Sequence, residues 1–144
     1  MFFIIFTENN CLLKKNIITV FFVFICATNF AQKAYPTNYF RAPLNIPIVL
    51  SGSFGELRSN HFHAGLDIKT QGKEGLNVYA AADGYVSRIK VQQFGYGKAI
   101  YVTHPNGYTT VYGHLKKFVT EIDSYVKTIQ YKKEDYQTGN LYFK

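Results

Sequence analysis

The fold prediction starts from the sequence AIYVTHPNGYTTVYGHL, residues 99–115. Two runs rich in β-branched and aromatic residues, 99–104 and 108–115, flank Pro105-Asn106-Gly107. Proline fixes φ, and Asn-Gly tolerates positive φ, so these three residues favour a tight turn. The segment therefore predicts an antiparallel hairpin. In its second strand, the two-residue period places one set of side chains on a common face: Tyr108, Thr110, Tyr112 and His114.

The flanking segments extend this prediction in both directions. Residues 78–82, the turn Asp83-Gly84 and residues 85–91 have the pattern of a second hairpin. From Thr120 the period changes to that of an amphipathic helix, which carries Ile122, Tyr125, Val126 and Ile129 on one side. Thr120-Glu121-Ile122-Asp123 resembles a helix-capping start. Beyond Gln130 the chain is charged, and no further element is predicted.

Composition supports a mainly β protein. The chain has 144 residues, which fits one domain, and its 12 Tyr and 13 Phe with no Trp suit pleated surfaces. The net charge of +7 favours an anionic surface such as a cell wall. The lysines are scattered, and no arginine cluster interleaves with aromatic residues, so nucleic acid is not a predicted partner.

The first 31 residues have the pattern of a signal peptide. Lys14 and Lys15 precede the apolar run 17–27, and Ala31 supplies a small residue before the predicted cut. An apolar run of this length is too short to span a bilayer, which takes about 20 residues. We therefore expect an exported chain, in the periplasm, the cell envelope or the extracellular space, with no membrane span after cleavage. Both cysteines lie in this leader, so the mature chain has no disulfide.

Two histidines lie close to an aspartate in HFHAGLD, residues 61–67. Imidazole and carboxylate are favoured zinc ligands. His63 and Asp67 could share a metal only if the chain bends between them, and Gly65 permits such a bend. His61 and His63 lie on one strand face without a bend. Spacing alone does not decide between these two pairs.

The ordered motifs from Ser51 to Leu115 resemble those of the lysostaphin-type, or LytM-like, zinc metallopeptidases. They are FGELR, HFHAGLDIKT, AADGYV and FGYGKAIYVTHPNGYTTVYGHL. The resemblance implies a mainly β fold with an antiparallel core of the duplicated hybrid motif type, followed by one C-terminal helix. It also implies hydrolysis of peptidoglycan peptides, with zinc as cofactor, His63 and Asp67 as metal ligands and His114 as a catalytic residue. Arg58, His61 and Tyr112 are implied as possible cleft residues.

The sequence departs from the family pattern in one respect. The family also has an H-x-H pair on a late strand, and no histidine follows His114 in this chain. We therefore expect a truncated peptidase that is inactive alone. The alternative is a non-catalytic module that binds peptidoglycan or regulates another hydrolase. The predicted organisation is a signal peptide at 1–31, an extended leading segment at 32–50, a partial peptidase-like core at 51–119, and a helix with a truncated C-terminal segment at 120–144.

Overall fold

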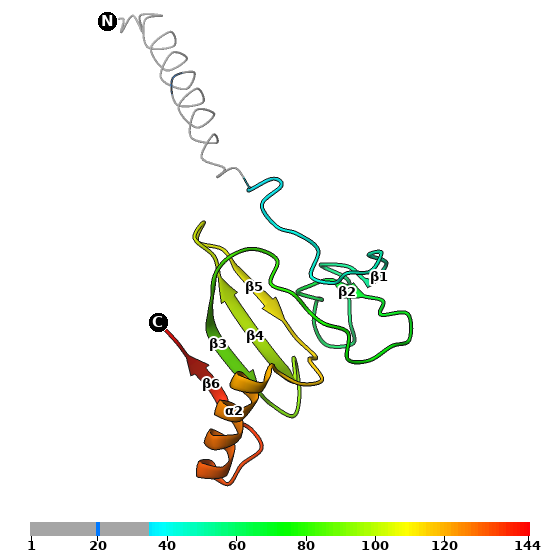
Figure 1. Cartoon of the computed structure of the whole chain (residues 1–144). Helices are drawn as coiled ribbons and strands as arrows, with labels where there is room; N and C mark the ends of the chain where they lie inside the picture. Colours follow the sequence, from blue (N-terminus) through cyan, green and yellow to red (C-terminus); the bar gives the residue numbers. More distant parts are fainter. Residues whose placement is uncertain (1–19, 21–34) are drawn as a thin grey trace, which may run out of the picture. The chain divides into compact units, whose positions relative to one another are not determined.

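The computed structural model of the chain describes Val20 and residues 35–144 (Figure 1). The signal peptide predicted at residues 1–31 lies outside the described residues, Val20 apart. Asn38–Lys144 form one compact unit. Its elements, in chain order, are β1 (Leu50–Gly52), β2 (Asp67–Ile68), β3 (Tyr85–Val91), β4 (Lys98–Thr103), β5 (Thr109–Tyr112), α2 (Thr120–Lys133) and β6 (Gly139–Tyr142).

The architecture is mainly β, with antiparallel sheets and a C-terminal helix, as the sequence predicts. A four-stranded sheet has the order β5-β4-β3-β6, and all its neighbours run antiparallel. β1 and β2 form a separate two-stranded sheet. Between residues 35 and 144, no helix is long and apolar enough to cross a membrane.

The predicted hairpin is confirmed as β4 and β5, with a shorter second strand than expected. Ile100 lies opposite Tyr112, and Thr103 lies opposite Thr109. Gly107 has a φ of 83°, the positive value that the Asn-Gly turn signal predicts. The second strand ends at Tyr112, and His114 has a φ of 53°. The prediction that His114 shares the strand face of Tyr112 is therefore wrong, because the two-residue alternation stops before Gly113.

The predicted hairpin of residues 78–82 with 85–91 is also wrong. Residues 78–82 form no strand, whereas β3 pairs with β4 on one side and with β6 on the other. The backbone of 78–82 bonds instead to the leading segment: the Tyr79 amide donates to the Pro43 carbonyl, and the Arg41 amide donates to the Ala81 carbonyl. Residues 78–82 therefore pair with the leading segment, which lies far away in sequence, and not with the adjacent residues 85–91.

One face of the four-stranded sheet is covered by α2, which forms as predicted. Val126 of the helix packs with Ile89 and Val91 of β3 and with Phe118, and all four are buried. The capping prediction at Thr120 is wrong, because the N-cap residue is Val119 and it makes no side-chain cap bond. Glu121 and Asp123 still place negative charge in the first turn, where the helix dipole favours it.

The C-terminal strand β6 is the element that the sequence analysis misses. It follows α2, shown in orange in Figure 1, and returns beside β3 as the red edge strand. Arg88 lies opposite Tyr142, and Val91 lies opposite Gly139. The buried Thr138 hydroxyl accepts a hydrogen bond from the Val91 amide at 3.2 Å. This strand therefore covers an edge of β3.

Replacing Val126 with Ala tests the packing of α2 on the sheet. The side chain is 2% exposed, so its loss should lower the free energy of unfolding by about 2 kcal/mol. Urea unfolding of the full chain, followed by circular dichroism, measures this difference. Thr128→Ala on the exposed side of the helix is the control and should change stability by less than about 0.5 kcal/mol. Equal unfolding midpoints for the two variants would contradict the assigned core.

Candidate metal site

A narrow backbone turn positions His63. The Gly55 amide donates to the His63 carbonyl and the His63 amide donates to the Glu56 carbonyl, both at 2.8 Å. Leu57 and Phe62 form an antiparallel bridge closer to the turn. Residues 55–63 therefore fold back on themselves, and the backbone of His63 is fixed before its side chain makes any contact.

Asp67 is positioned by the small sheet. It lies opposite Gly52 in the pairing of β1 with β2. The chain bends at Gly65, and the side chains of His63 and Asp67 converge, with 3.3 Å between His63 Nε2 and Asp67 Oδ1. The φ angle of Gly65 is not in the positive region, so the bend does not use the special freedom of glycine. The structure thus brings together the pair that requires a bend.

His63 and Asp67 each make a further hydrogen bond, through the atom that does not face the other side chain. His63 Nδ1 lies 3.1 Å from the Ser53 carbonyl oxygen, which can only accept, so Nδ1 is the donor and Nε2 is the ring nitrogen that faces Asp67. Arg58 donates to Asp67 Oδ2 at 2.7 Å and to Glu56 Oε2 at 3.4 Å. Two carboxylates and one guanidinium leave a net negative charge beside His63. The cluster therefore favours a cation electrostatically.

The ion pair of Arg58 with Asp67 fills the space above Gly52. A Cβ atom at Gly52 would lie 2.6 Å from Asp67 Oδ2, and still closer to the Arg58 guanidinium. Both distances are shorter than real Cβ contacts. The glycine thus allows the carboxylate and the guanidinium to meet over the backbone of β1.

His63 and Asp67 have the spacing of two ligands that bind one zinc ion. Bonds of about 2.0–2.2 Å at tetrahedral angles place two donor atoms roughly 3.3 Å apart. The distance between His63 Nε2 and Asp67 Oδ1 matches this value. Zinc-bound histidines commonly donate their other nitrogen to a carbonyl, as His63 does to Ser53. Among Val20 and residues 35–144, no group of three His, Cys, Asp or Glu side chains is arranged to hold a metal.

His61 lies outside this cluster. Its Nδ1 is 2.6 Å from the Asn60 side-chain oxygen, and the residue is exposed. The Arg58 amide donates to the His61 carbonyl at 2.9 Å, so His61 closes the turn through its backbone.

His114 is exposed in the segment that follows β5. Its amide donates to the Tyr96 carbonyl at 2.8 Å. Two residues later, Lys116 forms an ion pair with Glu74 at 2.9 Å, and this hydrogen bond holds the pKa of the Glu74 carboxyl below its ordinary value. Within residues 35–144, His114 does not join His63 and Asp67 in one metal-binding group.

Tyr112 belongs to a hydrogen-bonded network. Its hydroxyl accepts from the Ala81 amide at 2.7 Å and lies 2.9 Å from the Thr110 hydroxyl. His104, only 3% exposed, bonds through Nε2 to Thr110 and through Nδ1 to the Asp83 carbonyl. The Tyr112 hydroxyl thus ties β5 to the segment before β3.

The chain was compared with models of protein families. The model of Peptidase family M23 matches residues 61–131, about half of the chain. This segment belongs to peptidase family M23. It contains His63, Asp67, Tyr112 and His114, whereas Arg58 precedes it.

The curated relatives carry a related name. "DD-carboxypeptidase/endopeptidase Mpg" of Neisseria meningitidis serogroup B and its counterpart in Neisseria gonorrhoeae are each 37% identical over 62 residues. The alignment covers 43% of this chain and 14% of each relative. The chain thus matches only a small part of the length of these relatives. No solved structure matches the chain significantly.

Sequence reasoning misses three residues that support this candidate metal site: Gly52, Ser53 and Glu56. Ser53 contributes its backbone carbonyl, which any residue would offer, and Gly52 contributes empty space. Their roles depend on the fold of residues 52–67 and leave no signal in the residue types. Glu56 lies in the FGELR motif, so its position two residues before Arg58 was the available clue.

The Gly52→Ala variant tests the close approach at β1. The added methyl should displace Arg58 and Asp67, lowering the free energy of unfolding by about 1–3 kcal/mol. Urea unfolding measures the effect. Gly65→Ala is a matched control, because its Cβ would lie 3.8 Å from His63 Nε2, an ordinary contact. If both variants are as stable as the parent, the packing described at Gly52 is wrong.

Proposed function

We propose that this chain carries the metal-binding part of a zinc-dependent peptidase domain that acts on peptidoglycan peptides in an exported compartment. The observation that carries the proposal is the 3.3 Å approach of His63 Nε2 to Asp67 Oδ1, with each side chain held by an outer partner. Membership of the M23 family, which is generally zinc-dependent, supports it. The name of the Neisseria relatives supports the cleavage of peptide bonds.

The residues take distinct roles in this proposal. His63 Nε2 and Asp67 Oδ1 hold zinc, and Arg58 keeps the Asp67 carboxylate oriented through its other oxygen. When bound, zinc supplies Lewis-acid activation of water and of the scissile carbonyl. The exposed His114 imidazole accepts or donates the proton that peptide hydrolysis moves. His61 and Tyr112 remain candidate contributors to the substrate cleft.

The site offers two protein ligands among the described residues, whereas a catalytic zinc takes three and an open position. We therefore propose that this chain binds zinc weakly and has no peptidase activity alone. Hydrolysis then needs a further ligand from outside the described cluster.

The second candidate is a non-catalytic module that binds peptidoglycan or regulates another hydrolase. The charge pairing of Arg58 favours it. Asp67 Oδ2 already pairs with Arg58 at 2.7 Å, so this oxygen of the carboxylate has a cationic partner without a metal. Such a cluster could hold the turn of residues 55–63 in shape as a purely structural element.

Zinc titration of the full chain separates these candidates. In competition with a chromophoric chelator, the parent chain should bind one zinc weakly. His63→Ala and Asp67→Asn should each weaken binding by at least about tenfold, because each variant loses one of the two protein ligands. His61→Ala is the control and should bind as the parent does. Zinc uptake that is unchanged in both ligand variants would exclude this site. No zinc uptake by the parent would favour the non-catalytic module.

A further inference from the structure

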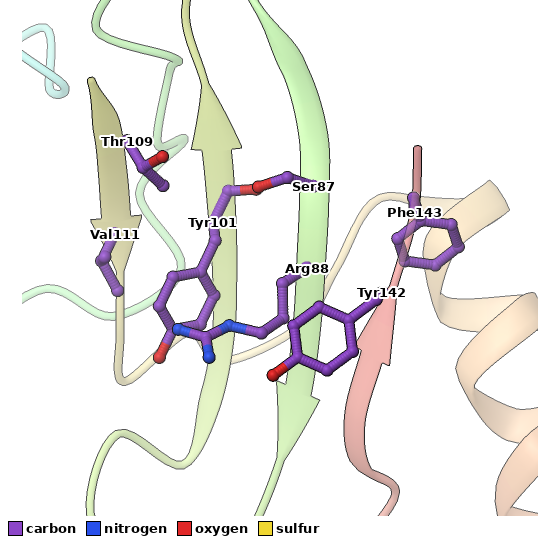
Figure 2. Close-up of a pocket in the computed structure, with 7 residues that line it drawn as sticks. All are labelled: Ser87, Arg88, Tyr101, Thr109, Val111, Tyr142 and Phe143. Carbon is purple, nitrogen blue, oxygen red and sulfur yellow. The ribbon is translucent and has the colours of Figure 1, made fainter. Parts of the chain in front are cut away.

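A second feature lies on the face of the four-stranded sheet that carries Arg88. Here a cavity of about 500 Å³ opens to solvent. Its lining comes from all four strands and the residue after β6 (Figure 2): Ser87, Arg88, Tyr101, Thr109, Val111, Tyr142 and Phe143. The volume lies in the range of small-ligand sites. None of these residues belongs to the His63 and Asp67 cluster.

The strand register assembles one row across the sheet. Val111 lies opposite Tyr101, Tyr101 opposite Arg88, and Arg88 opposite Tyr142. The Arg88 guanidinium carbon lies 3.5 Å from the centroid of the Tyr101 ring and 5.8 Å from that of Tyr142. Figure 2 shows the guanidinium laid over Tyr101, with Tyr142 on its other side. The close contact with Tyr101, with Tyr142 farther away, thus holds the cation on the aromatic row.

The Arg88 guanidinium has no anionic partner within the described part of the chain. Among residues 35–144, no carboxylate lies within ion-pair distance of Arg88, and no acidic residue lines the cavity. An aromatic face satisfies the charge of a guanidinium only in part, because its N–H donors lie in the plane of the group and point past the ring. Arg88 is half-buried, so an incoming acceptor would meet a partly desolvated, oriented donor set.

Hydroxyl groups add polar atoms at one end of the cavity. The Thr103 hydroxyl lies 2.8 Å from that of Ser87 and 3.0 Å from that of Thr109. Ser87 and Thr109 both line the cavity. At the other end the ring of Tyr142, 70% exposed, offers a flat surface for aliphatic groups. The cavity therefore combines one charge, several hydroxyls and an aromatic wall.

We propose that this cavity binds the carboxylate of an acidic side chain in an extended peptide. The planar guanidinium pairs with a carboxylate through two parallel hydrogen bonds, which a neutral amide cannot match. The aliphatic part of the acidic side chain packs on Tyr142, and the peptide backbone meets the hydroxyls of Ser87 and Thr109. The net charge of +7 adds long-range attraction for an acidic ligand. This proposal is independent of the metal site.

A titration of the metal-free full chain tests the proposal. The probe is the tripeptide Ac-Ala-Glu-Ala-NH₂, followed by changes in amide chemical shifts, and Ac-Ala-Gln-Ala-NH₂ is the uncharged analogue. The glutamate peptide should bind at least about tenfold more tightly than its analogue, and Arg88→Gln should remove this preference. Arg88→Lys keeps the positive charge but lacks the planar pair of guanidinium donors, so it should retain only part of the preference for the glutamate peptide.

Lys90→Gln is the matched control. Lys90 lies two residues further along β3 and does not line the cavity. Its replacement with Gln removes the same charge as Arg88→Gln. The preference for the glutamate peptide should stay within about twofold of the parent, since only long-range attraction is lost. Thermal unfolding of each variant separates stability from binding: a purely structural Arg88 would change the midpoint without changing the discrimination between the two peptides.

Two results would overturn the proposal. The first is equal binding of the two peptides by the parent chain. The second is competition by inorganic phosphate as strong as that of the glutamate peptide, which would make the cavity a general anion site with no preference for a carboxylate.

Discussion

The irregularity in β3 is the constraint on which the sheet depends. The pairing of β3 with β4 shifts register between Val86 and Arg88, leaving Ser87 as the extra residue. In a regular strand, Val86 and Arg88 would share a face. The bulge rotates the alternation, so Val86 packs with Ile89 against the helix-covered core while Arg88 reaches the opposite face. The apolar core and the charged cavity are therefore two consequences of one backbone feature.

The candidate metal site depends on a different kind of constraint. Its two strands are only three and two residues long, so the backbone pairing of β1 with β2 cannot fix it alone. The additional order comes from polar contacts: the Ser53 carbonyl on His63, and Arg58 between Glu56 and Asp67. The two bonds of Arg58 cross the space that Gly52 leaves open. The site is held by a small ionic network on an exposed part of the fold.

The sequence predicts the parts of this structure that rest on local chemistry. The β4–β5 hairpin follows from Asn106-Gly107, and α2 follows from a helical period. β6 is missed because its partner, β3, lies about 50 residues earlier and Gly139–Tyr142 carries no alternation. Likewise, spacing does not decide between His63 with Asp67 and His61 with His63 as the metal-binding pair, because the first pair depends on the bend at Gly65. The ordered motifs indicate His63 and Asp67, but the supporting atoms become visible only in the folded chain.

Arg58 and Arg88 differ in whether a carboxylate lies near the guanidinium, and this difference determines whether the group is available to bind an anion. Arg58 donates to two carboxylates at one site, so its charge is balanced and its side chain supports the orientation of Asp67. Arg88 lies on an aromatic ring with no carboxylate near it among residues 35–144. A balanced guanidinium gains little from a new anion, because binding one would break existing ion pairs. An unbalanced, preoriented guanidinium has its donors available at no such cost. The same residue type therefore serves as a structural support at the candidate metal site and as the proposed binding group on the sheet face.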